Sequence, residues 1–592
     1  MDALIARKLY RMIPRTARAG LVARIPSTTQ VRIGKLLGSG TWRRKSFAPG
    51  TRRPVVNGGA RMRALVMADA TPMGVRQRNL HLVTSALDAA AVPYFCRPTD
   101  GLRSSVVVLM EHLDAATNAL RRLDEHVVVE QRRIPRIPSP LTADLTLDET
   151  QTTIRLFDPV TSPSGAWTLA HRYACDVEFW CRGGRNQLVG ATPDGRACVV
   201  AADDPDVFAE GWQLCDRLPR DGRQVYRTKH ALIQHTPEST RFPIDAVFTW
   251  VDGSDLDWAA HKHEALAGAG AGDLHATAAN ESRFTSRDEL RYALRSVVAH
   301  APWLRKIFLV TADQVPPWLD LGHPGVTVVR HHEIFADAGM LPTFNSHAIE
   351  SRLHHIPDLA EHFIYFNDDM FLGRPVLPRQ FFHANGLAKF FQSAAAIDPT
   401  PAGPYDLPVT AAAKNNRELM AARFGVTIHH KMRHAPYALR SSVLREMEDE
   451  LPGRFAATAS HRFRHPGDLS IPSSLAHYWG FATGRAVPDN IEMVYADLGH
   501  SDTPTRLASI LARRRNDVFC LNDTDADADP RHTAIVTEFL EAYFPYRAPF
   551  ELPDDVTAAR ARRSATELLR SAAVIPTARP IPTVATTLEM PR

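Results

Sequence analysis

The sequence lacks long apolar runs and the short motifs that mark several common enzyme classes. No window reaches the roughly 18–20 consecutive apolar residues of a membrane-spanning helix, and the apolar stretch after Met1 is too short for a secretory signal. GxxxxGKS/T, GxSxG, HExxH and a strand-linked GxGxxG are all missing, which removes the main support for P-loop kinases, α/β-hydrolases and zincins. We therefore expect a cytoplasmic protein without a membrane span.

Cysteine is also scarce, with six residues and no CxxC pair. Neither zinc-site spacing nor a disulfide framework is indicated in a chain of 592 residues. Buried or idle thiols in a reducing cytosol are the main interpretation, and a Cys175–Cys198 bridge is the alternative.

Acidic residues are almost absent from the first 54 positions, which carry a net charge of +12 while the whole chain carries +5. Such an arm suits an anionic partner, for example lipid headgroups, and the alternative is a solvated tail. No nucleic-acid-binding module pattern is present, so we expect no nucleic-acid partner. The arm predicts peripheral contact with the inner face of an anionic membrane.

The length exceeds one hydrophobic core, and an apolar content of 44% is typical of globular proteins. Composition predicts a basic, disordered arm over 1–60, an α/β domain of unknown role over 61–240, a second α/β domain over 241–555 and a tail over 556–592.

Apolar runs in the second half predict a mostly parallel α/β sheet. The expected strands are 244–250, 306–311, 326–329 and 362–366. A helix is expected over 286–298, because Ser286 and Glu289 have capping-box spacing. The Ala/Gly-rich segment 265–276 is expected to be a loop.

Two of these strands end in acidic turns, Asp252 with Asp255 and Asp368 with Asp369. In open α/β sheets, ligands bind beyond the carboxyl ends of the strands. Paired carboxylates there suit a hard divalent cation that neutralises a diphosphate. The alternative is that these are ordinary turn residues.

Histidine is plentiful, and two segments place it beside other polar residues. One contains His434 and the other contains Arg464 next to His465. A guanidinium matches phosphate oxygens, which makes Arg464 a candidate phosphate ligand. Either histidine could equally be an ordinary core or surface residue.

Five segments together resemble the Stealth family of sugar-1-phosphate transferases, which includes bacterial exopolysaccharide phosphotransferases and the lysosomal-enzyme N-acetylglucosamine-1-phosphotransferase. They are IDAVFTWVDGSD (Ile244–Asp255), Arg283–Leu319, Leu341–Phe371, Lys431–Trp479 and CLND (Cys520–Asp523). All four of the family's blocks stand in order over about 243–551, and residues 1–240 lie outside the match. Pro436-Tyr437 replaces the Pro-His of animal members.

The resemblance implies a Rossmann-like sheet, a divalent cation (Mg²⁺ or Mn²⁺), a UDP-sugar donor and a glycan acceptor. It makes Asp368 and Asp369 the metal-binding and catalytic acids, His434 the base and Arg464 the charge clamp. It also implies a set of substrate-binding residues: Asp252, Gly253, Asp255, Arg295, Asn345 and Asn522.

The chain is therefore predicted to transfer a hexose 1-phosphate from a UDP-sugar to a glycan hydroxyl, with release of UMP. One alternative is a metal-dependent glycosyltransferase that releases UDP. Another is a non-catalytic polysaccharide-binding protein on the same fold.

Overall fold

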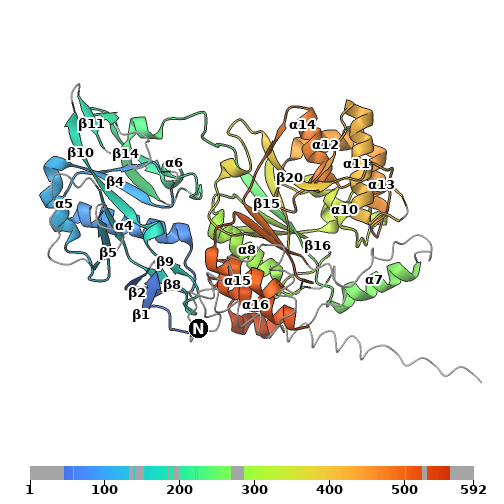
Figure 1. The fold of residues 1–592 in the computed structure, drawn as a ribbon, viewed down its shortest axis with the longest axis horizontal. Coiled ribbons are helices and arrows are strands. Elements are labelled where there is room, and N and C mark those ends of the chain that lie inside the picture. The colour runs from blue at the N-terminus through green and yellow to red at the C-terminus, as the bar shows by residue number, and fades with distance from the viewer. Residues whose placement is uncertain are drawn as a thin grey trace, which may run out of the picture.

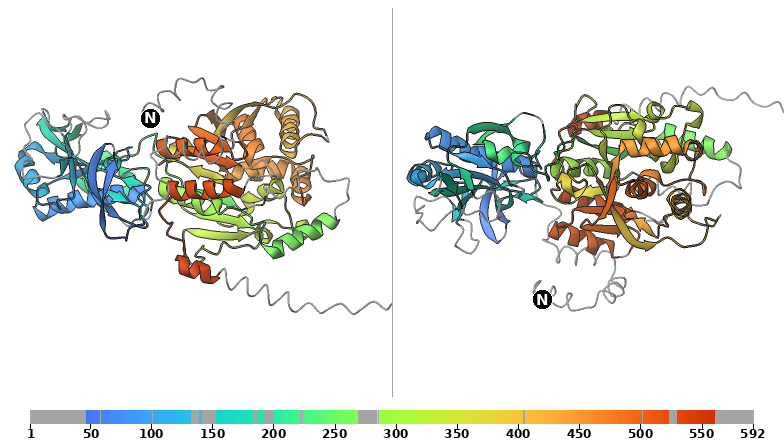
Figure 2. Two further views of the ribbon diagram at one scale, coloured as in Figure 1. Left: turned by 60° about the horizontal axis from the view of Figure 1, so that its bottom comes forward. Right: turned by 90° about the horizontal axis from the view of Figure 1, so that it is seen from above.

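A computed structural model describes residues 46–57, 59–99, 101–131, 139–140, 153–183, 186–190, 199–220, 222, 224–268, 284, 286–403, 405–500, 502–522 and 530–560. Its elements form two bodies side by side, from residues 52–233 and from 244 onward (Figures 1 and 2). Both combine helices with mixed sheets, so the predicted α/β class is confirmed, whereas the sheets contain antiparallel as well as parallel pairs. Within the described residues, no helix is long and apolar enough to cross a membrane.

The basic arm ends earlier than predicted. β1 (Arg52–Asn57) pairs antiparallel with β2 (Ala60–Val66), so a strand pair begins at residue 52 and the predicted bound of the arm at residue 60 is wrong. Arg52 reaches the buried carboxylate of Asp158 through two hydrogen bonds of 2.7 and 2.9 Å. The positive charge of Arg52, which composition places in a solvated arm, is therefore paired with a carboxylate inside the fold. Residues 1–45 lie outside the described part.

The larger sheet of the first body is built around β10 (Cys175–Gly183), which is buried over its first six residues. β10 pairs parallel with β4 (Ser104–Leu109) and antiparallel with β7 (Thr153–Phe157). Helix α4 (Pro72–Ala89) packs on this sheet and begins at Thr71, whose hydroxyl accepts from Gly74 N. The other elements of this body are β3 (Phe95–Arg97), η1 (Met110–His112), α5 (Leu113–Leu120), β5 (Val128–Gln131), β6 (Ser139–Pro140), β8 (Val160–Thr161), β9 (Thr168–Leu169), η2 (His171–Tyr173), β11 (Gln187–Val189), β12 (Val199–Ala201), β13 (Asp206–Glu210), α6 (Gly211–Leu214), β14 (Val225–Lys229) and η3 (His230–Ile233).

A five-stranded sheet forms the centre of the second body, in the order β17-β16-β15-β18-β22. Four strands are parallel: β15 (Ile244–Thr249), β16 (Ile307–Thr311), β17 (Val326–Arg330) and β18 (His362–Asn367). They match the predicted strands because buried strands of a parallel sheet have continuous apolar runs. The chain moves outward through β16 and β17 and then returns to the other side of β15 as β18. This reversal makes a switch point between β15 and β18.

The fifth strand, β22 (Tyr437–Arg440), runs antiparallel to β18, with Tyr437 opposite Tyr365. The segment before β22 therefore lies at the edge where β18 ends. Two smaller sheets flank this edge: β19 (Met370–Leu372) with β25 (Val518–Asn522) and β24 (Met493–Asp497), and β20 (Ala388–Ala396) with β21 (His430–Met432) and β23 (Ala486–Asp489).

Helices cover the central sheet on both sides (Figure 2). α8 (Glu289–His300) begins three residues after the predicted start, because Asp288 has a left-handed φ of 65° and the predicted capping box does not form. The loop predicted over 265–276 is wrong at its start, since α7 (Leu256–Gly268) continues to residue 268. The remaining helices are α9 (His331–Ile334), η5 (Ala338–Met340), α10 (Ser346–Glu350), η6 (Leu353–His355), η7 (Pro378–Gln380), α11 (Pro408–Phe424), α12 (Ser441–Glu450), α13 (Pro452–Ser460), η8 (Ile471–Leu475), α14 (Ala476–Ala482), α15 (Thr503–Arg513) and α16 (Pro530–Tyr543).

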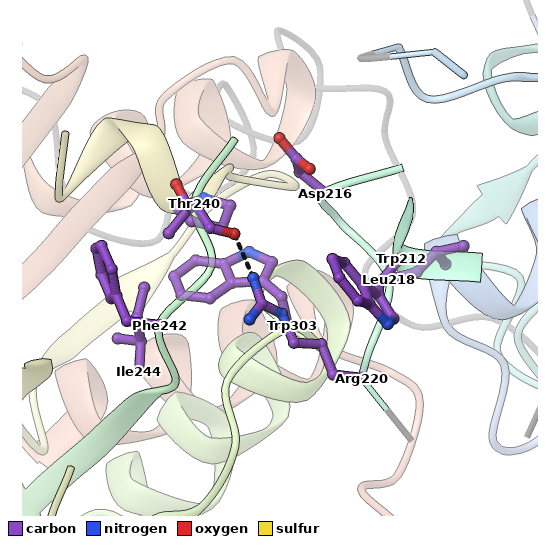
Figure 3. A pocket seen from close by; sticks show the side chains of 9 residues that line it. Trp212, Asp216, Leu218, Arg220, Thr240, Phe242, Ile244 and Trp303 are labelled. Atoms are coloured by element: carbon purple, nitrogen blue, oxygen red, sulfur yellow. Dashed lines mark hydrogen bonds between the residues drawn. The ribbon is translucent and has the colours of Figure 1, made fainter. Parts of the chain in front are cut away.

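The two bodies meet where the chain crosses from one to the other (Figure 3). Arg220 stacks over the Trp212 ring at 4.7 Å and donates to the carbonyl oxygens of Thr240 and Arg241. The cavity beside them is only about 10 Å³, which is room for at most one water. This junction is a packing contact and has no space for a ligand.

Candidate active site

The acidic turn Asn367-Asp368-Asp369 follows β18 at the switch point. Asp369 Oδ2 lies 3.3 Å from His434 Nε2 and accepts a hydrogen bond from Cys520 Sγ at 3.2 Å. Asp369 Oδ1 is buried and has no hydrogen-bond partner in the described part of the chain. The pairing of β19 with β25, with Met370 opposite Cys520, brings these distant segments together.

A third carboxylate, Glu289 of α8, lies close enough to this turn to raise the pKa of Asp368. Burial, followed by repulsion from Asp369 and Glu289, raises the pKa of Asp368 well above its usual range. The pKa of Glu289 is raised by its own burial and, more weakly, by Asp369. The sequence pattern assigned Glu289 to a helix cap, and only the fold reveals its proximity to the acidic turn.

This carboxylate group fits a hard divalent cation. An orphaned, buried carboxylate oxygen and crowded like charges are both relieved by a bound cation with oxygen ligands. Burial and Asp369 raise the pKa of the Cys520 thiol, so it stays protonated and is a poor ligand. Asp368 and Asp369 are therefore the residues that fit the predicted Mg²⁺ or Mn²⁺.

His434 stands three residues before β22 and reaches Asp369 because β22 is antiparallel to β18. Its Nδ1 lies 3.2 Å from the Tyr437 hydroxyl. Burial lowers the pKa of His434, but the charge of Asp369 and its hydrogen bond outweigh this and raise the pKa overall. In the protonated imidazolium, Nε2–H donates to Asp369, so this position stabilises a proton on Nε2.

The short helix α10 presents Ser346 and Glu350 on one face, one turn apart. The Ser346 hydroxyl accepts hydrogen bonds from Arg464 Nη2 at 2.8 Å and Nε at 3.3 Å. Buried Glu350 accepts from the Tyr365 hydroxyl at 3.2 Å and from Ser473 Oγ at 3.4 Å. Its negative charge acts on both His434 and Arg464. Sequence reasoning missed Glu350, since nothing in its local pattern distinguishes it from an ordinary helical glutamate.

Arg464 is positioned by a buried carboxylate, Asp468. Asp468 Oδ1 accepts a hydrogen bond from His461 Nδ1 at 2.6 Å. Asp468 Oδ2 accepts three more, from the Asn345 amide at 2.9 Å, His347 Nδ1 at 3.3 Å and the backbone N–H of His465 at 2.9 Å. Burial alone would raise the pKa of Asp468, but the hydrogen bonds from His347 and His461 lower it far below its usual range. Four hydrogen bonds fill most of the acceptor capacity of this carboxylate, so the histidine-rich group serves to fix the loop that carries Arg464.

Asn345 belongs to this support and does not face a substrate. Its side chain is fully buried, donating to the carbonyl oxygens of His461 and Phe463 as well as to Asp468. Its Oδ1 accepts from His347 N at the start of α10. The substrate-binding role predicted for Asn345 is therefore corrected to a structural one.

The turn after β15 lies on the other side of the switch point. Asp252 Oδ1 accepts from Ser254, and Asp255 Oδ1 accepts from Trp258 N at the start of α7. A Cβ on Gly253 would stand 2.6 Å from the carbonyl oxygen of Phe284, so only glycine fits. Asp255 thus caps a helix, and Asp252 remains the substrate-binding candidate of this turn.

Arg295, another predicted substrate-binding residue, forms an ion pair with Glu551. Its guanidinium donates to both oxygens of the buried Glu551 at 2.6 Å and to the carbonyl oxygen of Phe544 at 3.0 Å. These contacts occupy Nε and both terminal nitrogens of the guanidinium. The substrate contact predicted for Arg295 is therefore corrected to a structural ion pair. Asn522 ends β25 beside Asp497, and Asp523 lies outside the described residues.

A second metal-like group, His354, His355 and Glu448, lies on η6 and α12. Both histidine Nε2 atoms approach Glu448 Oε2, at 2.6 and 2.7 Å. Arg352 also pairs with this carboxylate. A guanidinium already supplies the positive charge there, so the group is an ion-pair network.

Four segments of the chain match models of one known protein family. Family models described as Stealth protein conserved regions 1, 2, 3 and 4 match residues 242–270, 283–390, 433–481 and 508–562. The chain is 43% identical to an exopolysaccharide phosphotransferase of Streptomyces coelicolor over 85% of this chain and 87% of that protein. It is 43% identical to exopolysaccharide phosphotransferase CpsY of Mycobacterium tuberculosis over 52% of this chain and 58% of that protein.

Among solved structures, the galactosyltransferase LgtC is similar at 12% identity, with a TM-score of 0.27, over 52% of this chain and 98% of that chain. A likeness of this size carries no argument about the site.

The carboxylate geometry predicts cation binding that depends on Asp369. The Asp369→Asn variant should bind Mn²⁺ at least about tenfold more weakly, because it loses one charge and one oxygen ligand. Its thermal stability without metal should be equal or slightly higher, since repulsion with Asp368 and Glu289 is reduced. Calorimetric titration and thermal unfolding measure both. Asp313→Asn, an exposed acid after the neighbouring β16, is the matched control, and equal Mn²⁺ affinity in both variants would contradict the assignment.

Proposed function

The chain belongs to the Stealth family, and from this membership we propose that it is an exopolysaccharide phosphotransferase that moves a hexose 1-phosphate from a UDP-sugar to a glycan hydroxyl. The acceptor oxygen attacks the β-phosphorus, a new P–O bond forms, the bond to the UMP oxygen breaks, and UMP leaves. The product is a sugar–phosphate–sugar diester.

The observation that carries this proposal is the convergence of four chemical groups from separate segments. They are Asp369 from the turn after β18, His434 from the segment before β22, Arg464 from the loop after α13 and Glu350 from α10. These groups act on one another's charge or hydrogen bonds. Phosphoryl transfer needs positioning and charge neutralisation more than covalent chemistry from the protein. His434 as a base, the positive guanidinium of Arg464, the carboxylate of Glu350 and the metal-compatible turn with Asp369 supply those needs.

His434 is proposed as the general base, with Nε2 as the atom that takes the acceptor's proton. Tyr437 fixes the ring through Nδ1, and the neighbouring Asp369 stabilises the imidazolium that forms. This arrangement accounts for a pKa raised above its ordinary value. If His434 fails this role, Asp252 and Asp368 are the next candidates.

Arg464 is proposed to contact the transferred phosphate. Burial lowers the pKa of its guanidinium, yet an arginine remains charged in any accessible pH range. Arg464 donates hydrogen bonds to the neutral Ser346 hydroxyl, while Glu350 and Asp468 balance its charge from nearby. A charged, half-buried fork of this kind matches phosphate oxygens.

Mg²⁺ or Mn²⁺ held by Asp368 and Asp369 would neutralise the donor's diphosphate. The turn with Asp252 and Gly253 is proposed to approach the nucleotide, because its backbone lies beyond the end of β15 at the switch point.

The nucleotide product tests the proposal. Purified protein incubated with Mg²⁺, UDP-glucose or UDP-N-acetylglucosamine, and a soluble oligosaccharide acceptor should release UMP, detected by ion-exchange chromatography. Phosphorus NMR should detect a new phosphodiester. Addition of EDTA should abolish both signals. Release of UDP would instead establish a glycosyltransferase, and glycan binding without either nucleotide would establish a binding protein.

Two variants should separate a base from a charge clamp. His434→Ala should lower the single-turnover rate by about 10²–10⁴-fold and leave donor affinity nearly unchanged, because a neutral imidazole contributes little to holding a diphosphate. Arg464→Ala should also weaken donor binding, by about tenfold or more, the value of a charge-assisted hydrogen bond. Arg464→Lys should rescue incompletely, since lysine lacks the planar fork.

Asp468→Asn serves as the positioning variant in the same measurement. It should weaken donor binding in the manner of Arg464→Ala, because its amide cannot accept all four hydrogen bonds. A loss of donor affinity in His434→Ala as large as in Arg464→Ala would overturn the base assignment.

The basic arm is proposed to hold the enzyme at an anionic membrane, at the inner face where cytoplasmic UDP-sugars are available. Deletion of residues 1–45 should leave UMP release on a soluble acceptor intact and weaken co-sedimentation with phosphatidylglycerol vesicles. The effect should diminish as salt is raised. Equal vesicle binding by the full-length and truncated proteins at low salt would identify the arm as a solvated tail.

A further inference from the structure

A cavity of about 310 Å³ lies between the two bodies, away from the acidic turn. The first body contributes Trp167, Arg172 and Arg217, and the second contributes His300, Arg374 and Arg514. Hydrogen bonds bridge the bodies around it, from Arg217 Nη1 to the carbonyl oxygen of Pro375 at 2.6 Å and from the Tyr546 hydroxyl to that of Trp167 at 3.0 Å.

The lining of this cavity is strongly cationic. Four arginines face one acidic residue, Asp517, among the lining side chains. Asp517 is already engaged, because its Oδ1 accepts from Arg374 Nε at 2.6 Å. The excess positive charge is therefore not neutralised within the lining, and a cavity of this kind attracts an anion.

Two buried polar groups in this lining lack hydrogen-bond partners. His300 is 1% exposed, and neither of its ring nitrogens has a partner within the described residues. Arg514 Nη1 is likewise buried and unpartnered, although Arg514 Nη2 donates to the carbonyl oxygen of Ala542 at 2.9 Å. Leaving buried polar groups unsatisfied is unfavourable. Burial, reinforced by the charges of Arg514 and Arg217, lowers the pKa of His300 to about 3, so its ring is neutral and has one N–H donor. A ligand with acceptor oxygens would satisfy that N–H and Arg514 Nη1.

The cavity is connected to the catalytic turn through one short strand. β19 begins directly after Asp369, and Gly373 and Arg374, which line the cavity, follow its last residue. Gly373 N donates to the carbonyl oxygen of Asp517 at 2.8 Å, which holds this end of the strand against β25. The cavity and the catalytic turn therefore lie at opposite ends of the three-residue strand β19.

We propose that this cavity is a second anion site, which binds one sugar phosphodiester unit of the glycan acceptor or product through His300, Arg172 and Arg514. The class of ligand rests on the proposed function, because that reaction makes phosphodiesters. The volume lies at the low end of small-molecule sites, about 300–1,000 Å³, which suits one sugar phosphate better than a UDP-sugar. Exposed Arg172 stands at the side open to solvent, where a longer glycan continues outward.

Binding of a defined probe tests the site independently of catalysis. A synthetic disaccharide joined by a phosphodiester is titrated calorimetrically into the full chain, with the uncharged disaccharide, UMP and inorganic phosphate as comparison ligands. Asp369→Asn should retain the affinity of the wild type for the phosphodiester, since the catalytic turn is not involved. The same result is expected even if the chain releases UDP or no nucleotide, so failure of the proposed function is recognised separately.

Two variants locate the binding. Arg172→Gln should reduce phosphodiester affinity at least about fivefold at low salt, and the control Arg122→Gln, an exposed arginine of the same body, should not. His300→Phe should reduce affinity at least about tenfold while leaving thermal stability equal or higher, because it removes two unsatisfied buried nitrogens. A purely structural histidine would give the opposite pattern.

With an acceptor that contains phosphodiesters, Arg172→Gln should raise KM and leave kcat unchanged, and with an uncharged acceptor both constants should match the wild type. The proposal is overturned if the phosphodiester fails to bind at millimolar concentration, if Arg172→Gln and His300→Phe bind it like the wild type, or if inorganic phosphate binds more tightly.

Discussion

The pairing of β18 on both of its edges is the constraint from which the candidate site follows. On one edge β18 lies parallel to β15, and on the other it lies antiparallel to β22. The first pairing sets the turn with Asp369 beside the turn with Asp252 at a switch point. The second brings the segment that precedes β22, with His434, to the same edge. A one-residue change of register would turn these side chains to the opposite face.

The site concentrates charge at a cost to stability, which the surrounding sheet must offset. Asp368 and Glu289 have raised pKa values because burial and repulsion disfavour their charged forms. One oxygen of Asp369 is left without a partner. Large aromatic residues of the adjoining strands, including Phe366 and Phe371, are fully buried beneath it. A rigid apolar base of this kind allows crowded carboxylates to persist until a cation and a phosphate arrive.

Sequence patterns predicted the four parallel strands and their acidic ends, because continuous apolar runs and their terminating turns are local signals. The roles of His434 as base and Arg464 as charge clamp were predicted from the family resemblance. Long-range contacts could not be predicted: Arg464 and Ser346 are 118 residues apart in sequence. For the same reason Arg295 and Asn345 were misassigned, since only the folded chain reveals the buried Glu551 and Asp468 that bind them. The arm's end was misplaced because Arg52 pairs with a carboxylate 106 residues away.

Two buried carboxylates near Arg464 show how hydrogen bonding separates a supporting role from a chemical one. Asp468 accepts four hydrogen bonds from its supporting neighbours and has a strongly lowered pKa. Glu350 accepts two longer hydrogen bonds from neutral hydroxyls, at 3.2 and 3.4 Å. Its charge is consequently available to Arg464 and His434, where it favours the protonated imidazole that forms when the acceptor hydroxyl loses its proton. Asp468 therefore fixes where Arg464 stands, whereas Glu350 sets the electrostatic environment in which Arg464 and His434 act.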